Sequence, residues 1–433
     1  EVTFASGYSY DYAPGDTICI TAGSRAALQL RDWYGTAEQP LVFMNSGGLV
    51  KIGNDPSLSG LSIIDSKHLQ LTGYAIQDIT YGIKVANTGA GNGLTVYDIE
   101  IDHIEISHPK FSGIMIKADP TATLETSRDS FTMRNIIVRD NYIHHVPGEG
   151  LYIGSSAYKG RPMTIGDTTV TVLPHVIRNL QVYNNIVEHT GWDGIQISSA
   201  DSSVHVYHNV VRDYGEYKTA SQQAGILIGG GTTGNFYNNE IHNGSGSGIE
   251  LLGIGDNYVY NNIITNAGYN YYPDSVSLRA YGIFTNDVVA SEGTGFHILN
   301  NTIVNPKTDG IRMYSTETTN NEIINNLIVA PGAYDLYLND GILATDPEDA
   351  YINLGTGFTA TVANNVQVMD IDSAGFTNYA NENYTLTSTS PAIDQGQQVV
   401  TASIFYDFAG GSRQLGNQTD AGAFEYVPVS NNN

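Results

Sequence analysis

Residues 181–198 read QVYNNIVEHTGWDGIQIS and contain one complete unit of a repeat that recurs along most of the chain. The unit consists of a short alternating strand, a pair of asparagines, a turn and a second strand that opens with Gly-Ile-x-Ile. In this copy the asparagine pair is Asn184 and Asn185, and the second strand opens at Gly194. Alternation of apolar and polar residues indicates short strands with one buried face. The repeat therefore predicts an all-β protein.

The second strand type recurs eight times, and its opening glycines are 23 to 44 residues apart. These glycines are Gly82, Gly113, Gly150, Gly194, Gly225, Gly248, Gly282 and Gly310. Constant strands separated by turns of variable length are typical of a parallel β-helix, in which each repeat forms one coil. We expect alternate side chains to point inward and to stack on the next coil roughly 4.8 Å away.

The second asparagine of each pair has a structural interpretation. An inward asparagine at a bend can bond to backbone groups that the turn leaves over, and to the equivalent asparagine of the next coil. We therefore predict an asparagine ladder and exclude its members from the candidate sites. They are Asn185, Asn209, Asn239, Asn262, Asn301 and Asn326.

The distribution of turns suggests a single elongated domain with four parts. Residues 1–50 are predicted to form an N-terminal cap and first coil, and residues 51–345 the coils. Residues 346–427 would form the last coils and a C-terminal module, followed by a disordered tail at 428–433. Long loops at about 118–130, 155–174, 214–223 and 267–281 belong to central coils, and they predict a groove unless they are ordinary tolerated insertions.

Composition excludes several classes of function. The formal net charge of the 433 residues is −25, which opposes nonspecific binding to nucleic acid or to an anionic membrane. Cys19 is the only cysteine, so the chain forms no internal disulfide. No apolar run is long enough to span a membrane. The chain starts at Glu1, consistent with removal of a signal peptide, and we expect a secreted protein.

Two resemblances sharpen this picture. The segment from Tyr384 to Tyr426 resembles a C-terminal module that follows secreted bacterial β-helices, with SPAID at 390–394, Arg413, and GAFEY at 422–426. The repeat region resembles the right-handed parallel β-helix superfamily of pectate-lyase-like proteins. That resemblance implies a right-handed solenoid, located outside the cell or on the bacterial surface. The superfamily includes polysaccharide lyases, glycoside hydrolases, epimerases and non-catalytic surface proteins.

Candidate chemistry lies in two rows of residues. In Gly-Ile-x-Ile the residue x faces outward. By resemblance, this outward row forms the commonest floor of a substrate groove. The row contains Lys84, Met115, Tyr152, Gln196, Leu227, Glu250, Phe284 and Arg312, and Lys117 lies two residues beyond Met115. The residue before each glycine forms a second row, in which Glu149 and Asp193 are neighbours. If their coils stack in register, the two backbones lie roughly 5 Å apart. Carboxyl groups that close perturb each other and suit a glycosidase, although turn capping or calcium binding would also explain them.

Cationic and aromatic residues cluster near these rows. Ten of the 19 Lys and Arg residues fall between 110 and 218, among them Arg134 and Lys218, which suggests a patch for an anionic ligand. The alternative is that they face several directions and pair with surface acids. His145 and His189 precede the turns of Glu149 and Asp193 and are candidate proton shuttles. One of His144 and His145 is expected to point inward.

Aromatic rings offer candidate stacking platforms for sugars. Tyr152, Trp192 and the YNYY run at 269–272 have the flat apolar faces that pack on pyranose rings. Trp192 is the preferred candidate because it lies in the turn of Asp193.

Three functions remain open at this stage. The first is a glycoside hydrolase for an anionic, sulfated or uronate-containing polysaccharide, with Glu149 and Asp193 as the catalytic pair and no required cofactor. The second is a polysaccharide lyase that draws its base and cation from Lys117, His145, Tyr152 and Arg134, with calcium held by the two carboxylates. The third is a carbohydrate-binding or surface protein. We rank the hydrolase first.

Overall fold

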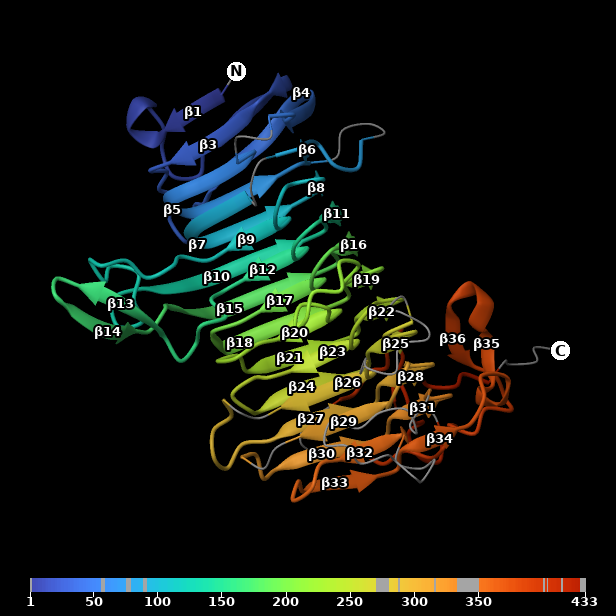
Figure 1. Ribbon diagram of the computed structural model, residues 1–433. Coiled ribbons are helices and arrows are strands. Elements are labelled where there is room, and N and C mark those ends of the chain that lie inside the picture. Colours follow the sequence, from blue (N-terminus) through green and yellow to red (C-terminus); the bar gives the residue numbers. More distant parts are fainter. Residues whose placement is uncertain are drawn as a thin grey trace. The chain divides into compact units, whose positions relative to one another are not determined.

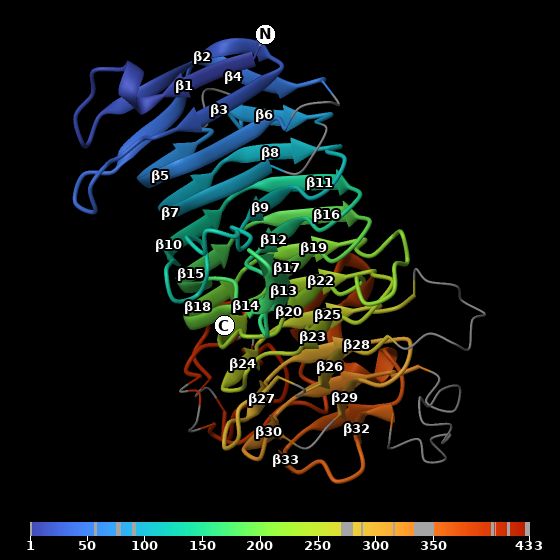
Figure 2. The ribbon, with the colours of Figure 1, turned by 60° about the vertical axis from the view of Figure 1, so that its left-hand side comes forward.

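The computed structural model describes residues 2–55, 59–74, 79–88, 92–269, 280–286, 289–314, 317–332, 350–399, 402, 404–413 and 416–428. The side chains of residues 92–97 lie outside this description. Residues 270–272 of the predicted YNYY platform, most of the loop at 267–281, the boundary at 345 and the tail after 428 also lie outside it, whereas Tyr269 is described and is 42% exposed. The chain divides into two compact units, Glu1–Thr233 (unit 1) and Gly234–Asn433 (unit 2). Each is described by itself (Figures 1 and 2).

One coil of unit 1 illustrates the architecture. Strands β10 (Thr132–Arg139), β11 (Tyr142–Val146) and β12 (Leu151–Ile153) follow one another around the coil. Each pairs in parallel with the matching strand of the next coil, which are β15 (Val176–Tyr183), β16 (Ile186–Thr190) and β17 (Ile195–Ile197). The strands thus build three parallel sheets, here called the first, second and third faces. The predicted parallel β-helix is confirmed.

The remaining strands of unit 1 extend the same three faces. The first face adds β2 (Thr17–Arg25), β4 (Leu41–Gly53), β5 (Leu61–Thr72), β7 (Asn92–Asp102) and β18 (Ala200–Tyr207). The second adds β6 (Ile83–Ala86), β8 (Ile104–Ser107) and β19 (Val210–Arg212), and the third adds β1 (Val2–Ser6), β3 (Ala27–Arg31), β9 (Ile114–Ile116) and β20 (Ile226–Ile228). A 3₁₀ turn, η1 (Gly7–Ser9), follows β1. Strands β4, β5 and β7 are long enough to contribute to two faces.

Unit 2 repeats the three faces. Its first face contains β21 (Gly234–Tyr237), β24 (Asn257–Tyr260), β27 (Phe296–Leu299), β30 (Asn321–Ile324) and β33 (Ala360–Ala363). Its second face contains β22 (Glu240–His242), β25 (Ile263–Thr265), β28 (Thr302–Val304), β31 (Leu327–Val329) and β34 (Val366–Val368). Its third face contains β23 (Ile249–Leu251), β26 (Ile283–Asn286), β29 (Ile311–Tyr314) and β32 (Ile352–Leu354).

The glycine of Gly-Ile-x-Ile is required by the close approach of neighbouring coils. A Cβ atom on Gly150 would lie 2.6 Å from the carbonyl oxygen of Gly194 and 2.3 Å from a methyl group of Val187. A Cβ atom on Gly194 would meet the carbonyl oxygen of Gly225 at 2.6 Å. Any larger residue would force the coils apart, so this position accepts only glycine.

The predicted asparagine ladder is present in both units. In unit 1 the side-chain amide of Asn141 donates to Asn185 Oδ1 at 3.0 Å, and that of Asn185 donates to Asn209 Oδ1 at 3.0 Å. In unit 2 the ladder runs through Asn239, Asn262, Asn301, Asn326 and Asn365. The first asparagine of a pair has a different role, because Asn184 turns the chain with φ +55. Asn141 and Asn365 extend the ladder beyond the predicted members.

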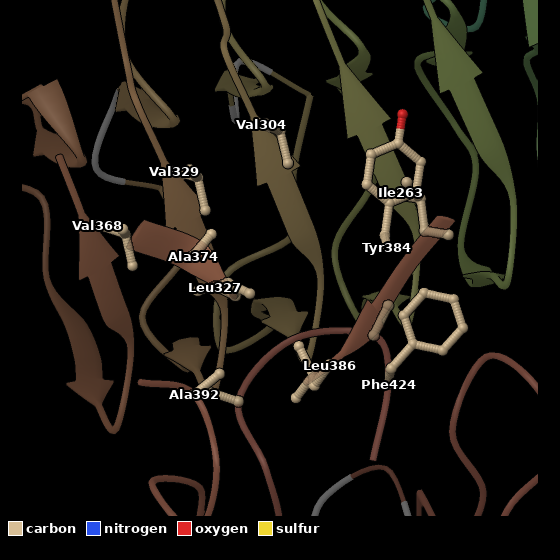
Figure 3. Close-up of a cluster of buried hydrophobic side chains, with 12 residues drawn as sticks. Ile263, Val304, Leu327, Val329, Val368, Ala374, Tyr384, Leu386, Ala392 and Phe424 are labelled. Carbon is tan, nitrogen blue, oxygen red and sulfur yellow. The ribbon is translucent and has the colours of Figure 1, made fainter. Parts of the chain in front are cut away.

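The outer side of the second face of unit 2 is apolar and is covered by the C-terminal segment (Figure 3). This segment contains η3 (Asp372–Ala374), β35 (Phe376–Asn378), η4 (Tyr379–Asn381) and β36 (Asn383–Leu386), and β35 and β36 pair antiparallel. The buried cluster joins Tyr384, Leu386, Ala392, Ala421, Ala423 and Phe424 to Ile263, Val304, Leu327, Val329 and Val368. The C-terminal segment therefore packs along the side of the coils.

A second set of contacts holds the same segment. Asparagines in the turns between the first and second faces donate to its backbone carbonyls. The acceptors are Tyr406 O for Asn261 at 2.8 Å, Gln397 O for Asn325 at 2.7 Å and Gln395 O for Asn364 at 2.8 Å. These turn asparagines therefore anchor the segment coil by coil.

Polar residues of the GAFEY-type motif bond both within the segment and to the coils. The buried guanidinium of Arg413 pairs with Glu425 at 2.9 Å and also donates to Asn261 Oδ1 at 2.6 Å. Asp420 accepts from the backbone amides of Asp394 at 2.7 Å and Tyr426 at 2.6 Å. Every charged residue of the motif thus has a structural partner, and the motif explains a local fold.

Candidate active site

The outward row of the third face forms the centre of the candidate site in unit 1. Met115, Tyr152, Gln196 and Leu227 are in register across β9, β12, β17 and β20. Lys84 does not belong to this row, because β6 lies on the second face, where Lys84 pairs with Glu105 at 2.5 Å. The Gly-Ile motif at position 82 opens a strand of another face, and its spacing alone did not reveal that difference.

The floor is more enclosed than expected. Tyr152 is 9% exposed and Gln196 is 2% exposed, and Gln196 Oε1 has no hydrogen-bond partner among the described residues. The Tyr152 hydroxyl lies 3.3 Å from the Ser156 hydroxyl in the loop that follows β12. A polar side chain that is buried without a partner on this floor is a group that a substrate hydroxyl could satisfy.

Two long loops pack against each other beside the third face. Residues 117–131 follow β9, and residues 154–175 follow β12 and contain the antiparallel hairpin β13 (Arg161–Ile165) and β14 (Thr168–Val172), which projects from the coils in Figure 1. Arg128 donates to Tyr158 O at 2.5 Å, and Arg161 pairs with Asp119 at 3.1 Å. These contacts place two of the four predicted long loops, at 118–130 and 155–174, beside the third face.

Lys117 occupies the floor itself. Its ammonium nitrogen lies 4.7 Å from the centre of the Tyr152 ring, within the range of a cation–π contact. It also pairs with Asp119 at 3.3 Å, and its side chain is 14% exposed. Asp119 was not predicted as a site residue, although its position two residues after Lys117 places it where an extended chain returns to the same side. A fixed cation next to a phenol is a suitable place for an anionic substrate group.

Glu149 is a buried carboxyl group at the corner between the second and third faces. It is 2% exposed, and its Oε2 atom has no hydrogen-bond partner among the described residues. Burial raises the pKa of Glu149 to about 6, while its own backbone amide and the charge of Lys117 act in the opposite direction. A carboxyl group that changes protonation near neutral pH is suited to general acid or base catalysis.

Asp193 lies on the next coil in register with Glu149. The Gly150 amide donates to Asp193 O at 3.1 Å, which fixes the two turns side by side as the sequence predicted. However, the side-chain Oδ1 of Asp193 accepts from the Ala224 amide at 2.7 Å, and the residue is 1% exposed. Asp193 therefore caps the following turn, as the structural interpretation of this residue proposed.

Trp192 is part of an aromatic row along the same corner. Its ring meets Phe111 edge to face at 5.5 Å, across Gly148, where a Cβ atom would lie 3.1 Å from the Phe111 ring. The backbone amide of the exposed Tyr217 donates to Gly191 O, next to Trp192. Phe111 and Tyr217 had not been singled out from the sequence, and only the coil register places them beside Trp192.

The predicted histidines form a column on the second face. His145 stacks on His108 at 4.9 Å and on His189 at 4.7 Å, and its Nδ1 lies 2.8 Å from Nδ1 of His144. His189 pairs with Glu216 at 2.8 Å, which raises the pKa of His189. His145 and His189 contact each other, His108, His144 and Glu216, so their proposed role as proton shuttles beside Glu149 has no geometric support among the described residues.

The expectation that one of His144 and His145 points inward is wrong. Ile143 and Val146 face the core, whereas His144 is half-buried and His145 is exposed. The reason is the positive φ of +53 at His145, which turns the chain by one extra residue and breaks the strand alternation. Burial lowers the pKa of His144.

The remaining predicted binding residues are dispersed. Arg134 is exposed on β10 of the first face, so it does not join Lys117 on the third face. Lys218 is half-buried in the loop after β19, at the same corner as Asp193. Glu250 lies on β23 of unit 2, where desolvation raises its pKa to about 7. These positions share no common surface within one unit.

The predicted cationic patch is also divided. Arg139 on the first face contacts Glu100, Asp102 and Asp140, and Arg178 pairs with Asp201 at 2.8 Å. Within the described ranges, these cations pair with acidic side chains and do not form one patch, which agrees with the alternative interpretation of the sequence. Lys117 is the predicted cation that the structure places on the floor of the site.

Comparison with known families agrees with the fold. A family described as right handed beta helix region matches residues 59–217 and 177–366. The protein belongs to this right-handed β-helix family. The comparison with curated proteins finds no match.

Several solved structures are similar in the course of the chain. Pectate lyase Pel9A is 13% identical with a TM-score of 0.49, over 96% of this chain and 89% of that one. The complex of XylC with xylose is 11% identical with a TM-score of 0.49, over 96% and 94%. A PL6 family polysaccharide lyase from Pseudopedobacter saltans is 12% identical with a TM-score of 0.44, over 82% and 89%. These similarities transfer no site residue to this chain.

Two further observations concern metals and membranes. In the part of the chain that the structure describes, no three Asp, Glu, His or Cys side chains gather closely enough to hold a metal ion. Glu149 and Asp193 alone do not make the oxygen-rich site that calcium prefers. None of the described helices has the length and apolarity to cross a bilayer.

Proposed function

We propose that the protein cleaves an anionic, uronate-containing polysaccharide by β-elimination on the third face of unit 1. The observation that carries the proposal is the cluster of Lys117, Tyr152 and Glu149. It combines a fixed cation, a phenol and a buried carboxyl group whose pKa is raised to about 6. Solved structures with a similar fold include a pectate lyase and an alginate lyase.

Each residue has a distinct role in the proposed reaction. Lys117 binds the uronate carboxylate and thereby acidifies the proton on C5. Glu149, ionised above pH about 6, accepts that proton. The electron pair of the C5–H bond forms a C4=C5 double bond while the C4–O bond breaks. The departing oxygen takes a proton from the Tyr152 hydroxyl, which solvent then reprotonates. Gln196 and Trp192 are proposed to position the sugar.

A glycoside hydrolase remains the second candidate, because Glu149 and Asp193 are in register on adjacent coils. A glycosidase needs both carboxyl groups to reach the scissile bond. The Asp193 carboxyl group, however, already accepts a hydrogen bond from the Ala224 amide through Oδ1. The lyase proposal needs only Glu149 and is therefore preferred over the hydrolase that the sequence had favoured.

The test is digestion of a panel of alginate, pectins, glycosaminoglycans, carrageenans and fucoidans, with and without a chelator. Reducing ends and the ultraviolet absorbance of unsaturated uronate would be followed together. Rise of both signals supports elimination, and loss of both with chelator would add a calcium requirement. Reducing ends without absorbance would replace the lyase by the hydrolase. Neither signal on any substrate would favour a binding protein.

Secretion and a bacterial surface location are part of the same proposal. The charge of −25 and the resemblance of residues 384–426 to a module of secreted bacterial β-helices support them. Detection of the protein in the medium or at the cell surface of its source organism would test this location directly.

A further inference from the structure

A cavity of about 560 Å³ lies in unit 2 between the coil turns and the C-terminal segment. Its volume is within the range that accommodates a small ligand. One wall consists of Asn300, Asn325 and Asn364, which are turn asparagines of three successive coils. The opposite wall consists of Gln397, Gln398, Asn417, Gln418 and Thr419, with Val399, Ile404 and Phe405 as the apolar part. The cavity is thus rich in amides and has one aromatic ring.

The amides on the two walls differ in whether they are hydrogen-bonded within the protein. The Asn325 side chain is used by the fold, since it donates to Gln397 O at 2.7 Å and accepts from the Gln397 amide at 3.0 Å. The side chains of Gln398 and Gln418 are exposed, and neither side chain forms a hydrogen bond to another described residue. Each therefore offers one acceptor and two donors to a ligand.

Charge at the cavity is nearly balanced. Arg413 is the charged lining residue, and its guanidinium is neutralised by buried Glu425 at 2.9 Å. Arg413 is 2% exposed, and its Nε atom has no hydrogen-bond partner among the described residues. This guanidinium is therefore held by the fold, and the exposed amides of the lining are the polar groups that remain for a ligand.

Phe405 supplies a surface of the kind that sugars prefer. It is 57% exposed, so its ring is accessible to a ligand. Flat apolar rings pack on the C–H face of a pyranose, while amides bond to its ring of hydroxyls. Anionic ligands gain little here because Glu425 already offsets the charge of Arg413.

We infer that this cavity is a second carbohydrate site, which binds a neutral mono- or oligosaccharide and takes no part in catalysis. It is built from residues of unit 2 only, and it does not rest on the proposed β-elimination. Such a site would bind uncharged sugar units or branches of a mixed polysaccharide, and the third face of unit 1 would act on its uronate units.

The inference is tested by titration calorimetry of the intact protein with xylose, glucose, galactose and mannose, their short oligosaccharides, and galacturonate as the charged comparison. We expect at least one neutral sugar to bind. Phe405→Ala should weaken it by about 3- to 10-fold, and Gln398→Ala or Gln418→Ala should also weaken it. Phe4→Ala, which removes a similarly exposed ring on β1, should leave it unchanged.

Cleavage of a polysaccharide that the protein digests is measured on the same variants. Unchanged cleavage together with weakened sugar binding supports a separate site. Absence of binding by any neutral sugar, equal binding by Phe405→Ala, or preference for galacturonate would overturn the inference. If no panel polysaccharide is cleaved, the calorimetry alone decides about this cavity, so failure of the catalytic proposal and of this inference remain distinguishable.

Discussion

The ammonium nitrogen of Lys117 lies 4.7 Å from the centre of the Tyr152 ring, across two neighbouring strands of the third face. Parallel register brings these residues together although they are 35 positions apart in the chain. The contact places a cation and a phenol on one floor, and the charge of Lys117 also lowers the pKa of the Glu149 carboxyl group against the larger effect of burial. The predictions below follow from this arrangement and from the coils that hold it.

Replacement of Lys117 by alanine should reduce kcat/KM on a uronate polysaccharide by roughly 10²–10³-fold, because a fixed charge that stabilises the transition state is lost. Lys117→Arg should retain part of the activity. The matched control is Lys51→Ala, an exposed lysine of β4. Equal activity of Lys117→Ala and the wild type in the ultraviolet assay would contradict the assignment.

Activity should depend on the ionisation of Glu149. Since the proposed base must be unprotonated, kcat/KM is expected to fall as the pH drops through about 6. Glu149→Gln should lose roughly 10²–10⁴-fold in rate and should also lose this acidic limb. A variant that keeps the limb with its original midpoint would show that another group titrates.

Glu149→Gln should lower activity but should make the folded protein more stable at neutral pH. Folding raises the pKa of Glu149 from 4.5 to about 6, so the folded protein binds the proton more tightly than the unfolded chain. Burial of this group therefore costs little below pH 4.5 and on the order of 1–2 kcal/mol above pH 6. Urea unfolding should find Glu149→Gln more stable than the wild type at pH 7.5, with the difference shrinking toward pH 4.

Asp193 separates the two catalytic candidates. Asp193→Asn keeps an oxygen that can accept from the Ala224 amide, so under the lyase proposal it should retain most activity and stability. Asp193→Ala leaves that buried amide without its partner and should cost about 1–3 kcal/mol. An inactive but stably folded Asp193→Asn would support the hydrolase instead.

The asparagine ladder should be far more sensitive than the neighbouring turn position. Asn185→Ala removes bonds to Val138 O, Tyr183 O and Asn209 Oδ1 and should lower the free energy of unfolding by on the order of 3 kcal/mol. Asn184→Gly, at φ +55, should be nearly neutral because glycine adopts this conformation readily. Similar losses for both variants in denaturant titrations would argue against the ladder.

Much of the coil could be predicted from the sequence because its determinants are local. The opening glycine and the inward asparagine recur with every turn, and both predictions hold at Gly150 and Asn185. The site was less predictable. Whether a side chain such as Gln196 is open or enclosed depends on how distant loops pack, and the face occupied by Arg134 depends on how the chain passes each corner.

The same limit explains the histidine column and the role of Asp193. A single residue with positive φ at His145 changes which neighbour points inward, and polar composition alone does not reveal it. Asp193 could be placed beside Glu149 by register, but its bond to the Ala224 amide depends on the shape of the following loop. Long loops carry the least periodic sequence and so allow the fewest predictions.

The turn asparagines that bind the C-terminal segment have a consequence for how this protein can change length. Asn261, Asn325 and Asn364 each lie at a bend of one coil. Each donates a side-chain hydrogen bond to one backbone carbonyl of the segment, at Tyr406, Gln397 and Gln395 respectively. The spacing of the attachment points along the segment therefore matches the number of coils that it covers. Insertion or deletion of one coil in unit 2 would put these attachment points out of step, so this part of the solenoid cannot grow or shrink by single repeats unless its tail is rebuilt at the same time.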